Sequence, residues 1–200
     1  MNRILCAAGT GFFALILTGC PTGGIQSNRE VYLTNRAETT NNPASRGSIG
    51  PSTDEPEEPT SNSQILEMRK AAKELSARTE DSATDVQVQH LLISFAGTGT
   101  LAQRTKAEAE KLAAELFAKV NAGADFDALV KANTDDSHPG IYTMVSKQSR
   151  EDRSTNVFFR GGMVPAFGNT GWRLKVGEIG VAAYHSSDSP FGWHIVKRLK

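Results

Sequence analysis

The eight residues at 86–93 read Val86-Gln87-Val88-Gln89-His90-Leu91-Leu92-Ile93. Alternate residues of a strand face opposite sides of a sheet, and both alternate sets here contain valine, leucine or isoleucine. A strand that is apolar on both faces lies inside a sheet that is covered on both sides. The stretch therefore predicts a central strand within residues 83–95, with one histidine, His90, in its middle.

Two helices are predicted directly after this strand. Residues 105–108, Thr-Lys-Ala-Glu, have the spacing of a capping box, in which the first and last residues bond to each other's backbone N–H. Apolar residues then recur at helical spacing as far as Val120, and Gly123 can end the helix in the left-handed conformation. Asp125 is placed to cap a second, shorter helix.

The C-terminal part mixes irregular and regular segments. Residues 134–155 are polar and loop-like apart from an apolar run at 141–145. A turn flanked by aromatic residues follows at 158–167, and two apolar segments, 181–184 and 193–199, are joined by another turn. We predict a terminal hairpin, and overall an α+β domain of about 120 residues with a mainly antiparallel sheet.

The N-terminal residues have the pattern of an export signal. Arg3 precedes a mostly apolar run at 4–17, which is too short to span a bilayer because about 20 apolar residues are needed. Residues 17–20, Leu-Thr-Gly-Cys, resemble the lipobox of bacterial lipoproteins. That resemblance implies removal of residues 1–19 and acylation of Cys20. The alternative is an ordinary cleaved signal with an incidental cysteine.

The next segments are predicted to be a tether and a helix. Residues 20–63 are rich in Ser, Thr, Asn and Pro and cannot bury enough apolar surface to offset the entropy of ordering, so we predict a disordered linker. Residues 64–79 are predicted to form an amphipathic helix with Ile65, Met68 and Leu75 on one face. We expect this helix to pack on the domain. The alternative is that it offers its apolar face to clients or to a second copy.

Charge and cysteine content exclude several classes of function. The 22 Lys and Arg residues balance 22 Asp and Glu residues, whereas nucleic-acid binding requires a concentrated positive surface. The only cysteines are Cys6 and Cys20, which excludes a Cys-based zinc site or a catalytic thiol in the folded part. There is also no phosphate-binding loop and no G-x-S-x-G motif. We expect neither a metal nor a cofactor.

Several short segments of the folded part occur together, in this order, in one family of enzymes. They are residues 88–93, 107–110, 123–129, 134–137, 159–167, 174–179 and 191–196. On these segments residues 84–200 resemble the parvulin-type peptidyl-prolyl cis/trans isomerases. The resemblance implies a parvulin-like (FKBP-like) domain, with a four-stranded, mainly antiparallel sheet wrapped by helices. It also implies non-covalent twisting of X-Pro bonds in unfolded or extended polypeptides.

The resemblance assigns polar roles to three residues. The two histidines that stand back to back in the sheet of the family fall on His90 and His194. The polar residue that faces the reacting carbonyl falls on Asp136. Each has a structural alternative, since histidines among apolar neighbours on strands are commonly core residues and an aspartate can simply end a helix or form a turn.

The resemblance also implies an apolar pocket for the proline ring. Its walls fall on Met163 and Phe167, and Phe191 lies at the position of the rim. Either Ile141 or Tyr142 is a candidate for a further wall, in place of a leucine of the family. Without the resemblance, Met163 and Phe167 would be interpreted as core residues, because they are four residues apart.

The export signal and the domain together predict a lipid-anchored isomerase that assists the folding of exported proteins. Its place would be the cell envelope, either the outer membrane facing the periplasm or the cell membrane. Residues 153–156 read Arg-Ser-Thr-Asn where many parvulins have Gly-Asp-Leu-Gly. This departure motivates an alternative, a catalytically weak or inactive binding or chaperone module. A third interpretation is a structural lipoprotein that merely retains the fold.

Overall fold

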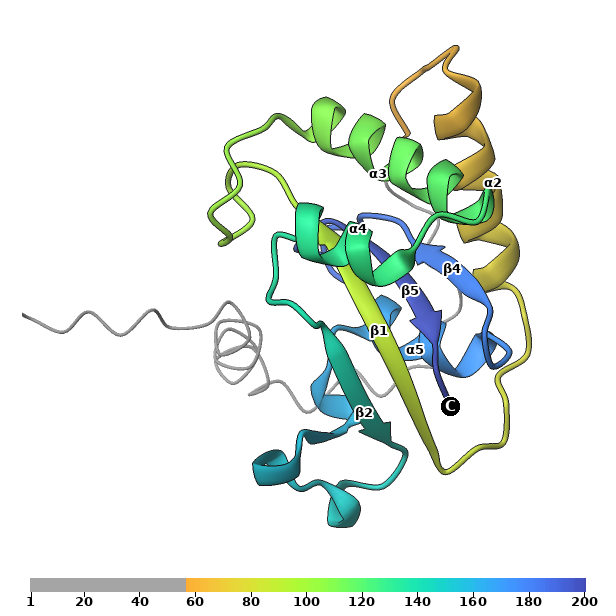
Figure 1. Ribbon diagram of the computed structural model, residues 1–200, viewed down its shortest axis with the longest axis vertical. Helices are drawn as coiled ribbons and strands as arrows, with labels where there is room; N and C mark the ends of the chain where they lie inside the picture. Colours follow the sequence, from red (N-terminus) through yellow and green to blue (C-terminus); the bar gives the residue numbers. More distant parts are fainter. Residues whose placement is uncertain (1–56) are drawn as a thin grey trace, which may run out of the picture.

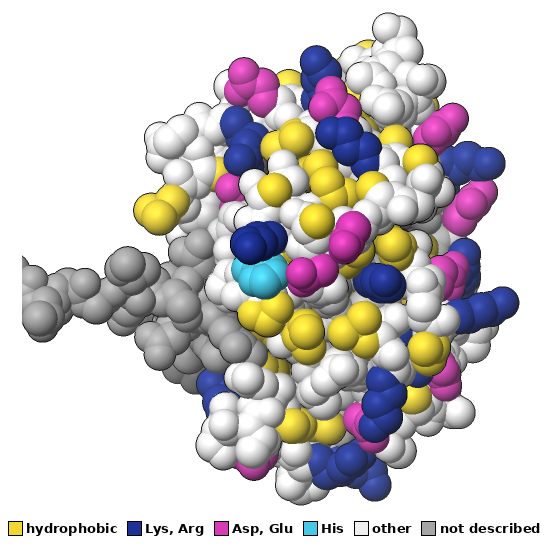
Figure 2. All heavy atoms as spheres, viewed as in Figure 1, with side chains coloured by type: hydrophobic (Ala, Val, Ile, Leu, Met, Phe, Trp, Pro, Cys, Tyr) yellow, Lys and Arg dark blue, Asp and Glu magenta, His cyan; other side chains and the backbone are white. Residues whose placement is uncertain are grey.

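The computed structural model describes residues 57–200, which form one sheet with helices on both faces (Figure 1). The predicted signal peptide, Cys20 and most of the predicted linker lie outside the described residues. Between residues 57 and 200, no helix is long and apolar enough to cross a membrane. On the face seen in Figure 2, basic and acidic side chains are interspersed rather than gathered by sign.

The described α-helices are α2 (Ser63–Ser76), α3 (Lys106–Asn121), α4 (Phe126–Asn133) and α5 (Pro165–Arg173). Thr105 and Glu108 form the predicted capping box at the start of α3. The side chain of Asp125 accepts from a backbone N–H of α4, so this predicted cap is confirmed too. Helix α2 is capped by Asn62, whose side chain accepts from two backbone N–H groups.

The sheet has five strands rather than the four predicted. They are β1 (Asp85–Ile93), β2 (Ile141–Val145), β3 (Val157–Phe159), β4 (Ile179–Ala182) and β5 (Trp193–Arg198), in the spatial order β3-β2-β1-β5-β4. Only β2 and β3 pair in parallel. The prediction that β1 is central and that the chain ends in a hairpin is confirmed. Strand β3 was missed because three residues are too few to show an alternation.

Two apolar cores lie on opposite faces of the sheet. Helices α3 and α4 cover the face to which Leu91 and Ile195 point, and α5, which carries Trp172, covers the face with Val88 and Val196 (Figure 1). Gly171 lets α5 approach closely, because a Cβ there would lie 2.9 Å from the methyl carbon of Met144 on β2. Short 3-10 helices, η1 (Gln148–Arg150), η2 (Arg153–Thr155) and η3 (Arg160–Gly162), lie in the segments on either side of β3.

Helix α2 connects the two cores around the edge strand β4 (Figure 1). Its first half packs in the α3–α4 core, and Leu75 packs in the α5 core. Arg69 binds Glu110 of α3 at 2.7 Å and donates to the backbone oxygen of Glu58 at 2.8 Å. The helix therefore packs on the domain, as expected, and the last residues of the predicted linker contact it.

Candidate active site

The two predicted histidines meet on the α5 face of the sheet. His90 lies in the middle of β1, and His194 lies on β5 opposite Leu92, so the histidines are diagonal neighbours. Nδ1 of His194 is 2.8 Å from Nε2 of His90, and the rings are parallel to within 13°. Both side chains are buried. One nitrogen must donate and the other accept, so the pair shares one hydrogen.

Asp136 extends this pair into a line of polar groups. Its side chain is fully buried, and Oδ2 lies 3.7 Å from Nδ1 of His90. The same oxygen accepts a hydrogen bond from the hydroxyl of Tyr142 at 2.5 Å. Three buried atoms of the line have no hydrogen-bond partner among the described residues: Nδ1 of His90, Oδ1 of Asp136 and Nε2 of His194. Such orphaned atoms are uncommon in folded proteins, and a catalytic role is one of the reasons for which they are retained.

The environment sets the charges of this group. Burial alone would raise the pKa of Asp136, but the adjacent His90 and the hydroxyl of Tyr142 outweigh burial and hold the pKa below its ordinary value. Burial, followed by the neighbouring His90, lowers the pKa of His194 well below its ordinary value. At neutral pH Asp136 is therefore a carboxylate and His194 a neutral imidazole. Within residues 57–200, no three His, Asp or Glu side chains are grouped to hold a metal ion.

The loop between α4 and β2 places Asp136 opposite His90. The backbone N–H of Asp135 donates to the backbone oxygen of Leu92 on β1 at 2.9 Å. The carboxylate of Asp135 accepts from a backbone N–H just beyond β1 at 2.8 Å and pairs with Arg104, which precedes α3. The loop that precedes β2 thus continues the pairing with β1 past the first residue of β2. This pairing holds Asp136 in place.

Gly140 brings the same loop against β1. It accepts a hydrogen bond from the backbone N–H of His90 at 2.9 Å. Its φ is +64°, and a Cβ there would lie 2.5 Å from the carbonyl oxygen of His90, so only glycine fits. This role of Gly140 was not predicted from the sequence, although the next two residues were candidates for a pocket wall.

The predicted apolar residues lie beside the histidines. The ring centre of Phe167, on α5, is 4.7 Å from the ring centre of His90 and 5.7 Å from that of His194. Met163 is buried in the same core, at the start of the turn into α5. Phe191 is buried in the turn that leads into β5. The structure thus brings Phe167 next to the polar line and places Met163 in the same apolar core as Phe167.

The structure does not bring Ile141 to this group. Ile141 and Tyr142 are consecutive on β2 and therefore face opposite sides of the sheet. Ile141 is 37% exposed and lies opposite Gln89, whose side chain points to α4. Tyr142 lies on the α5 side, with its ring 5.5 Å from that of Phe167. Of the two candidates for the further wall, only Tyr142 lies beside Phe167 and Asp136, and its bond to Asp136 had no signal in the sequence.

Residues 153–156, the departure from the parvulin pattern, form a tight turn into β3. Arg153–Thr155 are a 3-10 helix, and Asn156 follows in the left-handed conformation at φ 61°. Asparagine is one of the few residues besides glycine that adopts this conformation readily. The segment therefore turns the chain without the glycines that many parvulins have there.

These features define an α+β domain with a buried histidine–carboxylate line. The chain matches the family model for the PPIC-type PPIASE domain over residues 69–200, and it belongs to this parvulin family of peptidyl-prolyl cis/trans isomerases. The match begins within α2.

Similar solved structures include the solution structure of TbPIN1, which is 20% identical in sequence and has a TM-score of 0.45. The match covers 59% of this chain and 99% of that chain. Another is the peptidyl-prolyl isomerase ESS1 from Candida albicans, which is 18% identical in sequence and has a TM-score of 0.42. The match covers 68% of this chain and 74% of that chain. A comparison with curated proteins gave no match.

Proposed function

We propose that the buried polar line is the catalytic group of this isomerase and that the apolar side chains beside it hold the proline ring of the substrate. The residues concerned are His90, Asp136, His194, Met163, Phe167 and Phe191. The observation that best supports this assignment is an ionised, buried carboxylate 3.7 Å from a paired histidine, which in turn contacts an aromatic ring.

Cis/trans rotation about an X-Pro peptide bond breaks no covalent bond. The barrier is about 18–20 kcal/mol because the amide loses its resonance when it twists. An isomerase therefore has to bind the twisted amide more tightly than either planar form. An acceleration of about 10³–10⁵ requires about 4–7 kcal/mol of such preference. Fixed polar groups in a site that excludes water can supply this amount.

Asp136 suits this requirement through its charge. A planar amide places partial negative charge on the carbonyl oxygen, and twisting withdraws that charge. A carboxylate near the oxygen disfavours the planar form, and transfer of the amide from water to an apolar site acts in the same direction. His90 and His194 would hold Asp136 in position, while Phe167 and Met163 fix the proline ring and the rest of the peptide rotates.

The assignment is tested by exchange NMR on X-Pro peptides with the full-length chain in mild detergent. Asp136→Asn should lower the exchange rate at saturating peptide, and Met163→Ala should weaken peptide binding. Met68→Ala, in the α3–α4 core, is the matched control for Met163→Ala and should leave peptide affinity unchanged. Unaltered turnover in folded Asp136→Asn and Met163→Ala proteins would contradict the assignment. Peptide binding without faster exchange by the unmodified protein would support a binding module instead.

We further propose that the isomerase is anchored through a lipid on Cys20 and assists the folding of exported proteins at the cell envelope. Support comes from the likeness of residues 17–20 to a lipobox, directly after an apolar run. Acyl chains contribute roughly 0.8 kcal/mol per buried CH₂, so more than one chain gives stable anchoring. Cys20→Ser should move the protein from the membrane to the soluble fraction, whereas Cys6→Ser should not. An unchanged distribution of Cys20→Ser would contradict the anchor.

A further inference from the structure

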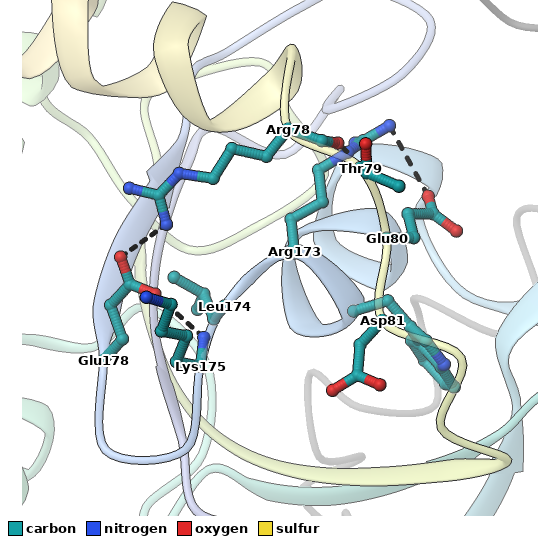
Figure 3. A pocket seen from close by; sticks show the side chains of 9 residues that line it. Arg78, Thr79, Glu80, Asp81, Arg173, Leu174, Lys175 and Glu178 are labelled. Atoms are coloured by element: carbon teal, nitrogen blue, oxygen red, sulfur yellow. Dashed lines mark hydrogen bonds and ion pairs between the residues drawn. The ribbon is translucent and has the colours of Figure 1, made fainter.

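The segment that follows α2 packs against the end of α5, where the backbone N–H of Asp81 donates to the backbone oxygen of Trp172 at 2.7 Å. It lines an open cavity of about 440 Å³ together with the end of α5 and the chain that leads to β4 (Figure 3). The charged residues of this segment are paired with residues of other elements: Arg78 with Glu178 at 2.5 Å, Glu80 with Arg173 at 3.5 Å, and Asp81 with Arg198 at 2.9 Å. Because these charges are compensated in pairs, the cavity is a junction between chain segments and not a good candidate for a ligand site.

Glu80 reaches from this junction to the turn that contains Met163. Arg160, the first residue of that turn, donates from Nη2 to Glu80 at 2.5 Å and to Asn169 of α5 at 2.6 Å. Its guanidinium also lies 4.6 Å from the ring centre of Trp172. The backbone oxygen of Arg160 accepts from the N–H of Met163 at 3.0 Å. Arg160 therefore joins the segment after α2, the turn and α5.

The contact between Glu80 and Arg160 is partly shielded from water. Their side chains are 33% and 22% exposed, so solvent screens this pair less than a fully exposed one. The hydrogen bond from Arg160 lowers the pKa of Glu80 and outweighs the opposing effect of burial, so Glu80 is ionised at neutral pH. Gly168 leaves room for the stem of Arg160, because a Cβ there would lie 3.3 Å from the Cγ of that arginine.

We propose that Glu80 is a positioning residue for the proline pocket. Through Arg160 it holds the turn of residues 160–163 against α5, which fixes Met163 relative to Phe167. This inference rests on the proposed assignment of Met163 and Phe167 as pocket walls. It gives the segment after α2 a role in substrate binding, although this segment touches neither the histidines nor Asp136 in any described contact.

The test compares two substitutions in the same cavity. Glu80→Gln keeps the shape of the side chain but removes its charge. Glu178→Gln is the matched control, since it weakens the pair with Arg78 and not the contact to the turn. Peptide affinity and the exchange rate at saturating peptide are measured by NMR on the full-length chain with ¹³C-methyl methionine. The methyl of Met163 reports on the pocket, and that of Met68 serves as an internal reference.

Glu80→Gln should raise the peptide Kd at least about threefold, leave the exchange rate at saturation near that of the unmodified protein, and shift the Met163 signal but not the Met68 signal. Glu178→Gln should change none of these. An unchanged Kd and Met163 signal in Glu80→Gln, or equal changes in both variants, would overturn the positioning role and leave the pocket assignment standing. If Met163→Ala itself leaves peptide affinity unchanged, the pocket assignment fails and the role of Glu80 fails with it.

Discussion

The substitution Tyr142→Phe removes a single oxygen atom and tests the electrostatics of the site. The hydroxyl of Tyr142 donates at 2.5 Å to Oδ2 of Asp136, whose Oδ1 has no partner among residues 57–200. Phenylalanine keeps the ring, whose centre lies 5.5 Å from that of Phe167 and 5.8 Å from that of Phe158. The change therefore isolates one hydrogen bond to a buried carboxylate.

The expected magnitude follows from that bond. A hydrogen bond to a charged group contributes about 1.5–3 kcal/mol. Since 1.36 kcal/mol corresponds to about one pKa unit, the pKa of Asp136 should rise by about 1–2 units in Tyr142→Phe. At neutral pH the carboxylate stays ionised, and the protein should lose about 1.5–3 kcal/mol of stability. On acidification the carboxylate is protonated earlier, so the acid limb of kcat/KM should move up by about 1–2 pH units.

Exchange NMR from about pH 3 to 8, a range that extends below the ordinary pKa of an aspartate at about 3.9, gives the activity profile, and urea unfolding at neutral pH gives the stability. Tyr184→Phe is the matched control, because it removes the same atom from a ring that packs on Phe95 and Trp193, away from the site. An acid limb in Tyr142→Phe at the position of the unmodified protein would refute the proposed role of Asp136. An equal shift in Tyr184→Phe would refute it as well.

Three further outcomes are expected. Gly192→Ala should cost more in urea unfolding than the about 1–3 kcal/mol of a strained backbone alone, because φ is +133° and the new Cβ would also lie 2.1 Å from a backbone oxygen of β1. Gly97→Ala, at φ +92° with open space around it, should cost only about 1–2 kcal/mol, and equal costs would contradict the packing argument. The free energy of unfolding should fall as the pH drops below about 6.5, because the lowered pKa of folded His194 means that the unfolded chain binds the proton first. His194→Gln should flatten that dependence, and a slope unchanged by the substitution would contradict the assignment. Arg104→Gln, which loses the ion pair with Asp135, should lower the exchange rate at saturating peptide with little change in affinity, and the reverse pattern would argue against its support of the catalytic loop.

The predictable part of the fold was the part encoded locally. The central strand, the capping box of α3 and the terminal hairpin each follow from periodicity or capping within a short window. Strand β3 leaves no such pattern. Which of Ile141 and Tyr142 faces the site depends on the register of β2 against β1, and a one-residue shift in register would exchange them.

The same distinction applies to the site. His90 and His194 are 104 residues apart, and their 2.8 Å contact depends on the pairing of β1 with β5. Only the resemblance to a family pointed to them, since each alone resembles a core histidine. The bond from Tyr142 to Asp136 and the pair of Glu80 with Arg160 join segments whose proximity no periodicity reveals. Contacts of this kind become visible only once the chain is folded.

Helix α2 has a consequence for a protein whose family acts on proline-containing peptides. An uncovered edge strand offers a row of backbone donors and acceptors to any extended polypeptide, and such pairing leads to aggregation. Strand β4 is one edge of this sheet, and α2 lies along it (Figure 1). The other edge, β3, is only three residues long. With one edge covered and the other short, the sheet offers little free backbone to which an extended peptide can add as a further strand.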